Sequence, residues 1–322
     1  MQNKPIEQMP SPSILERCAK AWGLRNLVFV RKMENIVYSC DSDQGKVYLR
    51  LTSPLRRVRP EIEAEIHWIE HLAKSGLQVP RLIANREGEK IVSLTEGDQH
   101  FEVVVFAEVK GKHPPAEMAV DPQFLNTLGA LIAKMHLASE TYEGAHLGIK
   151  REEWNEERGL RHALEAAANS DEVNLRDRLY TMVNWAKQLP RTAHNYGLIH
   201  ADLGALNLFM GDDDSISVID FDDSCHHWYM FDLAIVIFSN RRRAQQIDEK
   251  KWISALVLGY RTVRSLSEEE IALIPKWIEF ASLRLFFWTQ FHLSHHTFHE
   301  DVIERISSNQ EWLKKQLENT SA

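Results

Sequence analysis

Cysteine is scarce in this 322-residue chain, and long apolar runs are absent. Cys18, Cys40 and Cys225 stand alone with no C-x-x-C spacing, so the sequence predicts neither a disulfide framework nor a zinc ribbon. The longest apolar run, FDLAIVIF, is too short to span a bilayer, and the polar N-terminal segment does not resemble a secretory signal. We therefore expect a cytoplasmic protein without a membrane partner.

Glycine is missing from the places where several enzyme motifs need it. The sequence has no Gly-x-x-x-x-Gly-Lys-Ser/Thr loop and no Gly-x-Ser-x-Gly nucleophile elbow, and no two of its 14 glycines stand two apart, which excludes the usual Rossmann fingerprint. Positive charge is also in deficit, because 38 Lys and Arg face 46 Asp and Glu. The resulting net charge of −8 disfavours a nucleic-acid partner and is mildly compatible with a cationic substrate.

Residues 1–109 are dominated by short extended segments. The stretches NLVFVR, NIVYSCD and KVYLRL are rich in β-branched and aromatic residues, and KIVSLT with FEVVVFAEV predicts a further hairpin. One helix interrupts them after Pro60, where Ile62, Ile66, Ile69 and Leu72 recur at helical spacing. This part is predicted to be a small antiparallel sheet with one key helix.

Helical patterns dominate residues 110–322, and the Pro- and Gly-containing segment KGKHPPAEMAV marks the boundary. Asp121 and Pro122 have the types expected at an N-cap and a first helical position, and amphipathic stretches follow near 229–239, 250–264 and 268–294. Three short strands interrupt these helices between residues 197 and 221. The chain therefore reads as an α+β protein with two lobes.

The segment GLIHADLGALNLF (197–209) delivers a His, an Asp and an Asn at the end of an apolar strand, and Asp220 follows in VIDFDD. Asp202 is placed to accept a proton, whereas Asn207 and Asp220 offer hard oxygen ligands for Mg²⁺. Phosphoryl transfer from a nucleotide needs this set, and the spacing matches the catalytic and metal loops of the protein-kinase fold. The alternative is a pair of ordinary polar turns, with His200 bracing the loop by hydrogen bonding.

The third strand and the following helix predict an ion pair. In KVYLRL, Val47, Leu49 and Leu51 share one face, so Arg50 points to the other face, which we expect to border a nucleotide cleft. Glu65 falls inside the apolar stripe of the helix and needs a counter-ion. Arg50 is the candidate partner, since guanidinium meets carboxylate bidentately.

Together these segments resemble the aminoglycoside phosphotransferase and choline kinase-like family, small-molecule kinases with a two-lobed protein-kinase-like fold. The resemblance also runs through ENIVYSC, EAEIHWIEHLAKSGLQVPRLI, VVVFAEVKGK and WYMFDLAIVIF. It implies ATP and Mg²⁺ as cofactors, Asp202 as catalytic base, and Asn207 and Asp220 as metal ligands. It further implies an adenine-binding hinge from Phe106 through Glu108 to Val109, and a bracing role for Asp232.

Three positions depart from the family pattern. Leu206 stands where family members usually carry a Gly, and Gly204 stands where they often carry a His. We therefore expect this loop to have a different shape from that of the family. The turn RKMEN, which should cover the phosphates, has no glycine, so backbone amides or the Asn35 side chain must serve instead. Asp222 replaces the Gly that follows Asp-Phe in protein kinases and is a candidate accessory metal or substrate ligand.

The predicted function is transfer of the ATP γ-phosphate to a hydroxyl of a small molecule, such as an amino alcohol, a sugar-like compound or an antibiotic. A Ser/Thr protein kinase and a nucleotide-binding pseudokinase remain as alternatives. Two further features each have two interpretations. Trp154, Trp228 and Tyr229 either contact the acceptor or belong to the core. The second is a group of histidines on one helix face, which either binds a metal or does not: His292, His295, His296 and His299.

Overall fold

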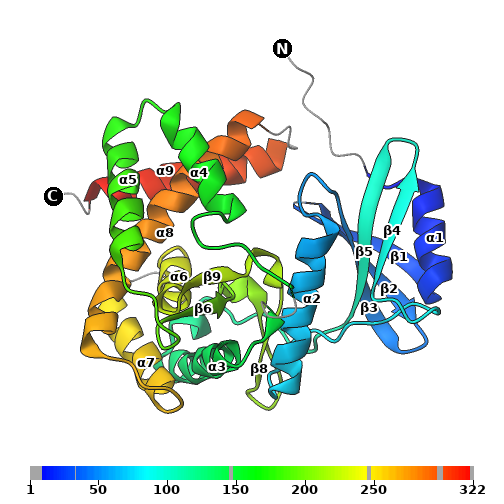
Figure 1. Cartoon of the computed structure of the whole chain (residues 1–322), viewed down its shortest axis with the longest axis horizontal. Helices are drawn as coiled ribbons and strands as arrows, with labels where there is room; N and C mark the ends of the chain where they lie inside the picture. Colours follow the sequence, from blue (N-terminus) through cyan, green and yellow to red (C-terminus); the bar gives the residue numbers. More distant parts are fainter. Residues whose placement is uncertain (1–8, 33, 145–147, 245–247, 296–299, 320–322) are drawn as a thin grey trace.

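The computed structural model describes residues 9–32, 34–144, 148–244, 248–295 and 300–319. A β-rich N-terminal part lies beside a larger, mainly helical part, as Figure 1 shows. This arrangement is the two-lobed α+β architecture predicted from the sequence. Among the described residues, no helix is both long and apolar enough to cross a membrane.

The N-terminal part is built on one antiparallel sheet with the strand order β1-β2-β3-β5-β4. Its strands are β1 (Arg25–Lys32), β2 (Ile36–Ser42), β3 (Gly45–Thr52), β4 (Ile91–Glu96) and β5 (Gln99–Ala107). Side-chain alternation decides the two faces of the sheet. Val47, Leu49 and Leu51 are fully buried on one face, whereas Arg50 lies on the other with Val104 opposite it on β5.

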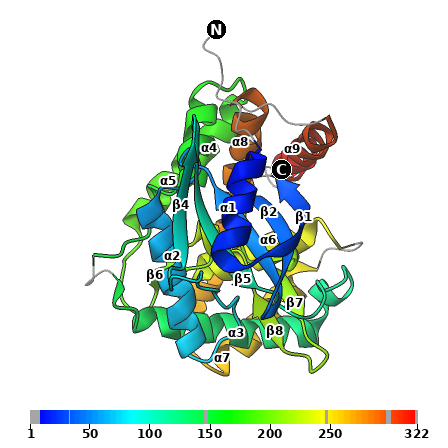
Figure 2. The same cartoon turned by 90° about the vertical axis from the view of Figure 1, so that its right-hand side faces the viewer.

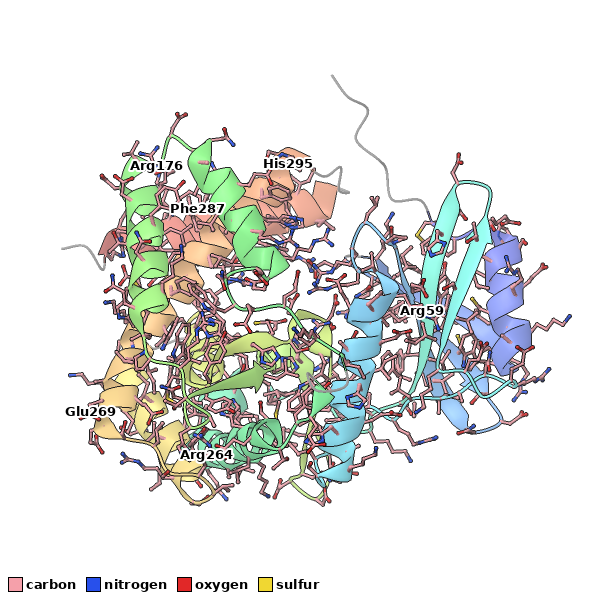
Figure 3. The ribbon with its side chains drawn as sticks, viewed as in Figure 1. Arg59, Arg176, Arg264, Glu269, Phe287 and His295 are labelled. Atoms are coloured by element: carbon pink, nitrogen blue, oxygen red, sulfur yellow. The ribbon has the colours of Figure 1, made fainter. Side chains whose placement is uncertain are left out.

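Two helices cover the two faces of this sheet (Figures 1 and 2). Helix α1 (Pro12–Trp22), which the sequence analysis did not predict, is capped by the Ser11 side chain and packs on the face that carries Leu49. Helix α2 (Arg59–Lys74) lies on the opposite face and is tied to the sheet by Arg59, which donates to Ser93 (Figure 3). The helix is therefore held directly behind Arg50.

The C-terminal part is a helical core with two small two-stranded sheets. Phe287 is buried in this core on the long helix 268–295, against which four of the other helices pack (Figure 3). The helices are α3 (Pro122–Glu140), α4 (Arg158–Ala168), α5 (Val173–Gln188), α6 (Met230–Arg241), α7 (Glu249–Arg261), α8 (Glu268–His295) and α9 (Glu300–Asn319). One antiparallel sheet pairs β6 (Tyr196–Ile199) with β9 (Cys225–Trp228), and the other pairs β7 (Leu208–Met210) with β8 (Ile216–Val218). Short 3₁₀ turns are η1 (Met118–Val120), η3 (Ala205–Asn207) and η4 (Phe221–Asp223).

Two elements connect the N-terminal and C-terminal parts. One is the segment that follows β5, and the other is helix α2. Lys112 and Met210 exchange backbone hydrogen bonds of 3.0 and 2.8 Å, which fixes the crossing segment against β7. Gly111 is needed at this crossing, because its φ is +117° and a Cβ would stand 2.2 Å from the Met210 carbonyl oxygen. From α2, Trp68 and Leu72 pack into the helical core. The cleft between the parts is thus closed at its back by packed residues.

Candidate active site

The loop after β6 is anchored by one buried carboxylate. Asp232, in the first turn of α6, is fully buried and accepts hydrogen bonds from the backbone amides of His200 (3.1 Å) and Ala201 (2.8 Å). Ala201 has a φ of +66°, a conformation that costs a non-glycine residue about 1–2 kcal/mol. Asp232 therefore holds the loop in a strained shape, which agrees with the bracing role predicted for it.

His200 links this loop to the strand that precedes Asp220. Its Nε2 lies 3.0 Å from the carbonyl oxygen of Ile219, and its Nδ1 accepts from the backbone amide of Asp202 at 3.2 Å. A carbonyl only accepts and a backbone amide only donates, so Nε2 is the donor and Nδ1 the acceptor in these two contacts. The side chain is fully buried and has both nitrogens engaged, so His200 braces the loop instead of transferring protons.

Asn207 orients Asp202. The Asn207 side-chain nitrogen donates to the Asp202 carboxylate and to the Asp202 backbone carbonyl, each at 2.8 Å. Asp202 is exposed to solvent as a residue. The protein atoms around its carboxyl nevertheless raise its pKa to about 7 by desolvation, and the negative charges of Asp223 and Asp220 act in the same direction. A carboxyl with such a pKa is well matched to a general base near neutral pH. Gly204 and Leu206 leave this contact intact.

Asp220 lies at the end of the strand-like segment after β8, with its backbone in the left-handed region at φ +65°. The backbone amide of Ile219 donates to the backbone carbonyl oxygen of Asn207 at 2.9 Å, so the segments that carry the two candidate metal ligands are joined. Asp220 also meets a residue that sequence reasoning missed: the Arg31 guanidinium donates to its carboxylate at 2.9 Å. Arg31 belongs to the turn RKMEN.

Arg50 and Glu65 form a bidentate ion pair with both N–O distances at 2.7 Å, which confirms the predicted pairing. The two residues are 7% and 1% exposed, so each charge depends on the other. The Arg50 guanidinium also lies over the Phe106 ring, 5.2 Å from its centroid. Its Nε is buried without a hydrogen-bond partner among the described residues.

A cavity of about 310 Å³ separates the sheet from the helical part. Of the predicted site residues, Arg50, Glu65, Phe106, Val109 and Asp220 line it. The Glu108 side chain lies outside the lining and near Lys46 at 3.8 Å, although the Glu108 backbone amide continues the strand pairing to the Lys46 carbonyl. The lining residues not predicted are Val30, Arg31, Val37, Tyr48, Ile69, Pro80, Ala107, His113, Leu206, Phe209, Ile219 and Phe221. Most of them are apolar, as a flat aromatic base requires.

Two predicted ligands, Asp222 and Asn35, have protein partners in this structure, and their roles as ligands stay predictions. Asp222, expected as an accessory metal or substrate ligand, is 4% exposed and both of its carboxylate oxygens receive hydrogen bonds from Arg56 or Arg57 at 2.9–3.1 Å. These arginines hold the pKa of Asp222 well below its usual range despite burial. Asn35, expected at the phosphates, donates to Asp222 and accepts from Thr52. Both residues thus belong to an ion-pair cluster that joins β3 and α2 to η4.

The aromatic and histidine groups also have structural roles. Trp154, Trp228 and Tyr229 are at most 4% exposed, so the core interpretation holds for them. His292 is buried beside Trp288, and His295 stacks on Phe291 near the end of α8 (Figure 3). His296 and His299 lie outside the described residues. Within the described part of the chain, neither His292 nor His295 belongs to a cluster with metal-ligand geometry.

The residues present fit a nucleotide and a divalent cation. Arg50, whose buried Nε has no hydrogen-bond partner among the described residues, lines the cavity and offers a positive charge to a phosphate there. The side-chain nitrogen of Asn207 is hydrogen-bonded to Asp202, which leaves the side-chain oxygen of Asn207 available to a cation. With the Asp220 carboxylate, this oxygen would form a set of hard ligands. These observations describe a phosphotransferase site.

Comparison with known proteins identifies the family. The sequence profile described as the phosphotransferase enzyme family matches residues 28–266, so the chain belongs to that family. The homoserine kinase of Afipia carboxidovorans is 31% identical over 78% of this chain and 74% of its own length. The amicoumacin kinase of Bacillus subtilis is 28% identical over 66% of this chain, and the match spans 62% of that relative. This chain is thus a kinase of small-molecule hydroxyl groups.

Solved structures support the same fold. An amicoumacin kinase in complex with AMP-PNP and Ca²⁺ has a TM-score of 0.84 at 23% identity, covering 96% of this chain and 94% of that one. A microcompartment-associated aminopropanol kinase has a TM-score of 0.73 at 24% identity, covering 94% and 95%. The protein-kinase-like α+β fold predicted from the sequence is therefore confirmed, and use of ATP with a divalent cation follows from the family.

Proposed function

We propose that this protein is a Mg²⁺-dependent kinase that transfers the γ-phosphate of ATP to the hydroxyl of a small amino alcohol. The observation that carries the proposal is the Asn207 side chain, which orients the Asp202 carboxylate while leaving its own carbonyl oxygen to a cation. Base and metal ligand are thereby coupled within one loop. This coupling is what in-line phosphoryl transfer to a hydroxyl requires.

The chain's own residues divide the work of the reaction. Asp202 accepts the acceptor's hydroxyl proton while the hydroxyl oxygen bonds to the γ-phosphorus, and the bond from that phosphorus to the bridging oxygen breaks to release ADP. Asn207 and Asp220 hold Mg²⁺, which neutralises phosphate charge when bound. Arg50, positioned by Glu65, binds the α- and β-phosphates, and Phe106 to Val109 contact the adenine.

The preference for an amine rests on charge. Desolvation raises the pKa of Asp202, and the negative charges of Asp223 and Asp220 add to this rise, so a cationic group in the acceptor would relieve the excess of negative charge around the base. Asp223 remains one-third exposed although it contacts Arg56, so it is available to such a group. The relatives named for homoserine and aminopropanol act on compounds with both an amine and a hydroxyl, in agreement with this class.

An acceptor panel tests the proposal. ADP release is measured with homoserine, 1-amino-2-propanol and ethanolamine, with matched analogues that lack the amine, and with Ser/Thr peptides. We expect kcat/KM for the best amino alcohol to exceed that of its deamino analogue by about 100-fold, which corresponds to one charge-assisted contact of about 3 kcal/mol. Equal values for both members of each pair would contradict the amine preference. Transfer to peptides alone would favour the protein-kinase alternative.

A further inference from the structure

The turn between β1 and β2 lacks the glycines that let backbone amides surround a phosphate, and it carries an arginine at the cavity instead. Arg31 is the first residue of RKMEN, near the end of β1, and is the second cation of the cavity lining, after Arg50. Asn35, the other polar candidate of this segment, is occupied by Thr52 and Asp222. Arg31 is therefore the polar side chain of this segment that faces the cavity.

A strand irregularity directs Arg31 into the cleft. Phe29 pairs with Tyr38 and Arg31 pairs with Val37, so Val30 is one extra residue on β1 between these two pairs. Such a bulge reverses the side-chain alternation beyond it and turns the next side chain to the other face. Without the extra residue, Val30 would oppose Val37 and Arg31 would point away from the cavity.

Two arginines flank Val37 in one row across three strands. Val37 is the register partner of Arg31 on β1 and of Arg50 on β3, and directly opposite residues share a face of the sheet. All three residues line the cavity. The sheet thus presents two guanidinium groups, about two strand spacings apart, to whatever occupies the cleft. A polyphosphate has charges that extend over such a distance.

The two arginines differ in how firmly they are held. Arg50 is buried in its bidentate pair with Glu65, whereas the Arg31 and Asp220 side chains are 51% and 27% exposed. An exposed ion pair contributes about 0–1 kcal/mol, so the contact between Arg31 and Asp220 does little to hold the lobes together. The buried contacts of Arg56 and Arg57 with Asp222 join them more firmly. Arg31 is therefore able to exchange Asp220 for another anion at small cost.

We infer that Arg31 binds the terminal phosphates of the nucleotide, a role that rests on the proposed ATP dependence. Guanidinium groups form charge-assisted, often bidentate hydrogen bonds with phosphate. If Asp220 holds a divalent cation, its carboxylate would be less available to Arg31, and the phosphates would offer the Arg31 guanidinium other oxygen acceptors. Arg31 thus replaces the missing glycine-rich turn, and its side chain distinguishes ATP from nucleotides with fewer phosphates.

Isothermal titration calorimetry with AMP, ADP and AMP-PNP in the presence of Mg²⁺ tests this inference on the full chain. We expect Arg31→Gln to weaken AMP-PNP binding about tenfold, the effect of one charge-assisted hydrogen bond, and to change AMP binding less than about twofold. Arg31→Lys should retain part of the affinity. The matched control is Arg25→Gln on the same strand, which removes an exposed pair with Asp43 and should leave all three affinities unchanged.

The outcomes separate this role from others. Equal weakening of AMP and AMP-PNP would show that Arg31 shapes the cavity, and unchanged AMP-PNP binding by Arg31→Gln would overturn the inference alone. Absence of AMP-PNP binding by the wild type would overturn the proposed function and this inference together. Thermal unfolding of each variant checks the fold, which the loss of an exposed ion pair should not alter.

Discussion

The side-chain nitrogen of Asn207 lies 2.8 Å from both the carboxylate and the backbone carbonyl oxygen of Asp202. One amide therefore fixes the orientation of the candidate base and closes the loop that carries it. The intervening residues, including the unusual Gly204 and Leu206, do not disturb this contact. The geometry expected of an active kinase is thus kept, which argues against the pseudokinase alternative.

Replacing Asn207 by Ala should impair both functions of its side chain. We expect a loss of about 2 kcal/mol in the free energy of unfolding from two hydrogen bonds, and a fall in kcat of about 100-fold. Denaturant titration and steady-state kinetics over a range of Mg²⁺ concentrations measure these effects. The exposed Asn174→Ala on α5 serves as the control. A variant with normal kcat and normal Mg²⁺ dependence would show that Asn207 is not a metal ligand.

Replacing Glu65 by Gln should affect folding and nucleotide binding together. The substitution leaves the Arg50 charge buried without a carboxylate, so we expect the free energy of unfolding to fall by about 3 kcal/mol and ATP affinity to fall about tenfold. The control is Glu63→Gln on the same helix, whose exposed pair with Arg59 should contribute less than about 0.5 kcal/mol. Similar losses in both variants would refute a special role for the buried pair.

Replacing Asp232 by Asn should loosen the strained loop. One carboxylate oxygen becomes an amide donor that faces a backbone donor, so we expect a loss of about 2 kcal/mol in stability and a marked fall in kcat. Ala201→Gly removes the conformational cost at φ +66°, so adding it to Asp232→Asn should restore part of kcat. A double-mutant cycle on kcat gives the coupling. If the two effects are additive, Asp232 does not act through the strain at Ala201.

We expect the buried side chain of His227 to make the stability of the protein depend on pH. This side chain is 2% exposed, and burial lowers its pKa well below the usual histidine value of about 6.5, so the folded state keeps it neutral in a pH range where the unfolded state protonates it. The unfolded state then binds more protons between the folded pKa and pH 6.5, and stability rises with pH in that window. His227→Phe should reduce the slope by up to about 1.4 kcal/mol per pH unit.

Chemical denaturation between pH 5 and 7 measures this slope. His194→Phe is the control, because His194 is exposed and its replacement should leave the slope unchanged. An unchanged slope in His227→Phe would mean that the His227 pKa is not lowered by folding.

Local sequence patterns predicted those parts of the site that depend on nearby residues. Alternation along β3 placed Arg50 on the cleft face, and helical spacing placed Glu65 inside the apolar stripe of α2. The spacing from Asp202 to Asn207 fixed their contact, since both belong to one short loop. These relationships extend over 15 residues or fewer, where backbone geometry alone decides which side chains can meet.

Relationships between distant segments were missed. Arg31 and Asp220 are 189 residues apart, and their contact depends on the bulge at Val30 and on the packing of the two lobes. The contacts of Arg56 and Arg57 with Asp222 have the same origin and were not predicted either. Helix α1 was missed for a different reason, because its Ser-Pro start was interpreted only as a polar N-terminal segment.

The central claim is that Asp202 serves as the base for phosphate transfer to a small hydroxyl compound. Its most direct test measures label transfer from γ-labelled ATP to the best amino alcohol by the wild type, by Asp202→Asn and by the exposed control Asp177→Asn. We expect transfer by the wild type and the control, a rate about 1,000-fold lower for Asp202→Asn, and similar AMP-PNP binding by all three. Transfer by Asp202→Asn at the wild-type rate would contradict the claim.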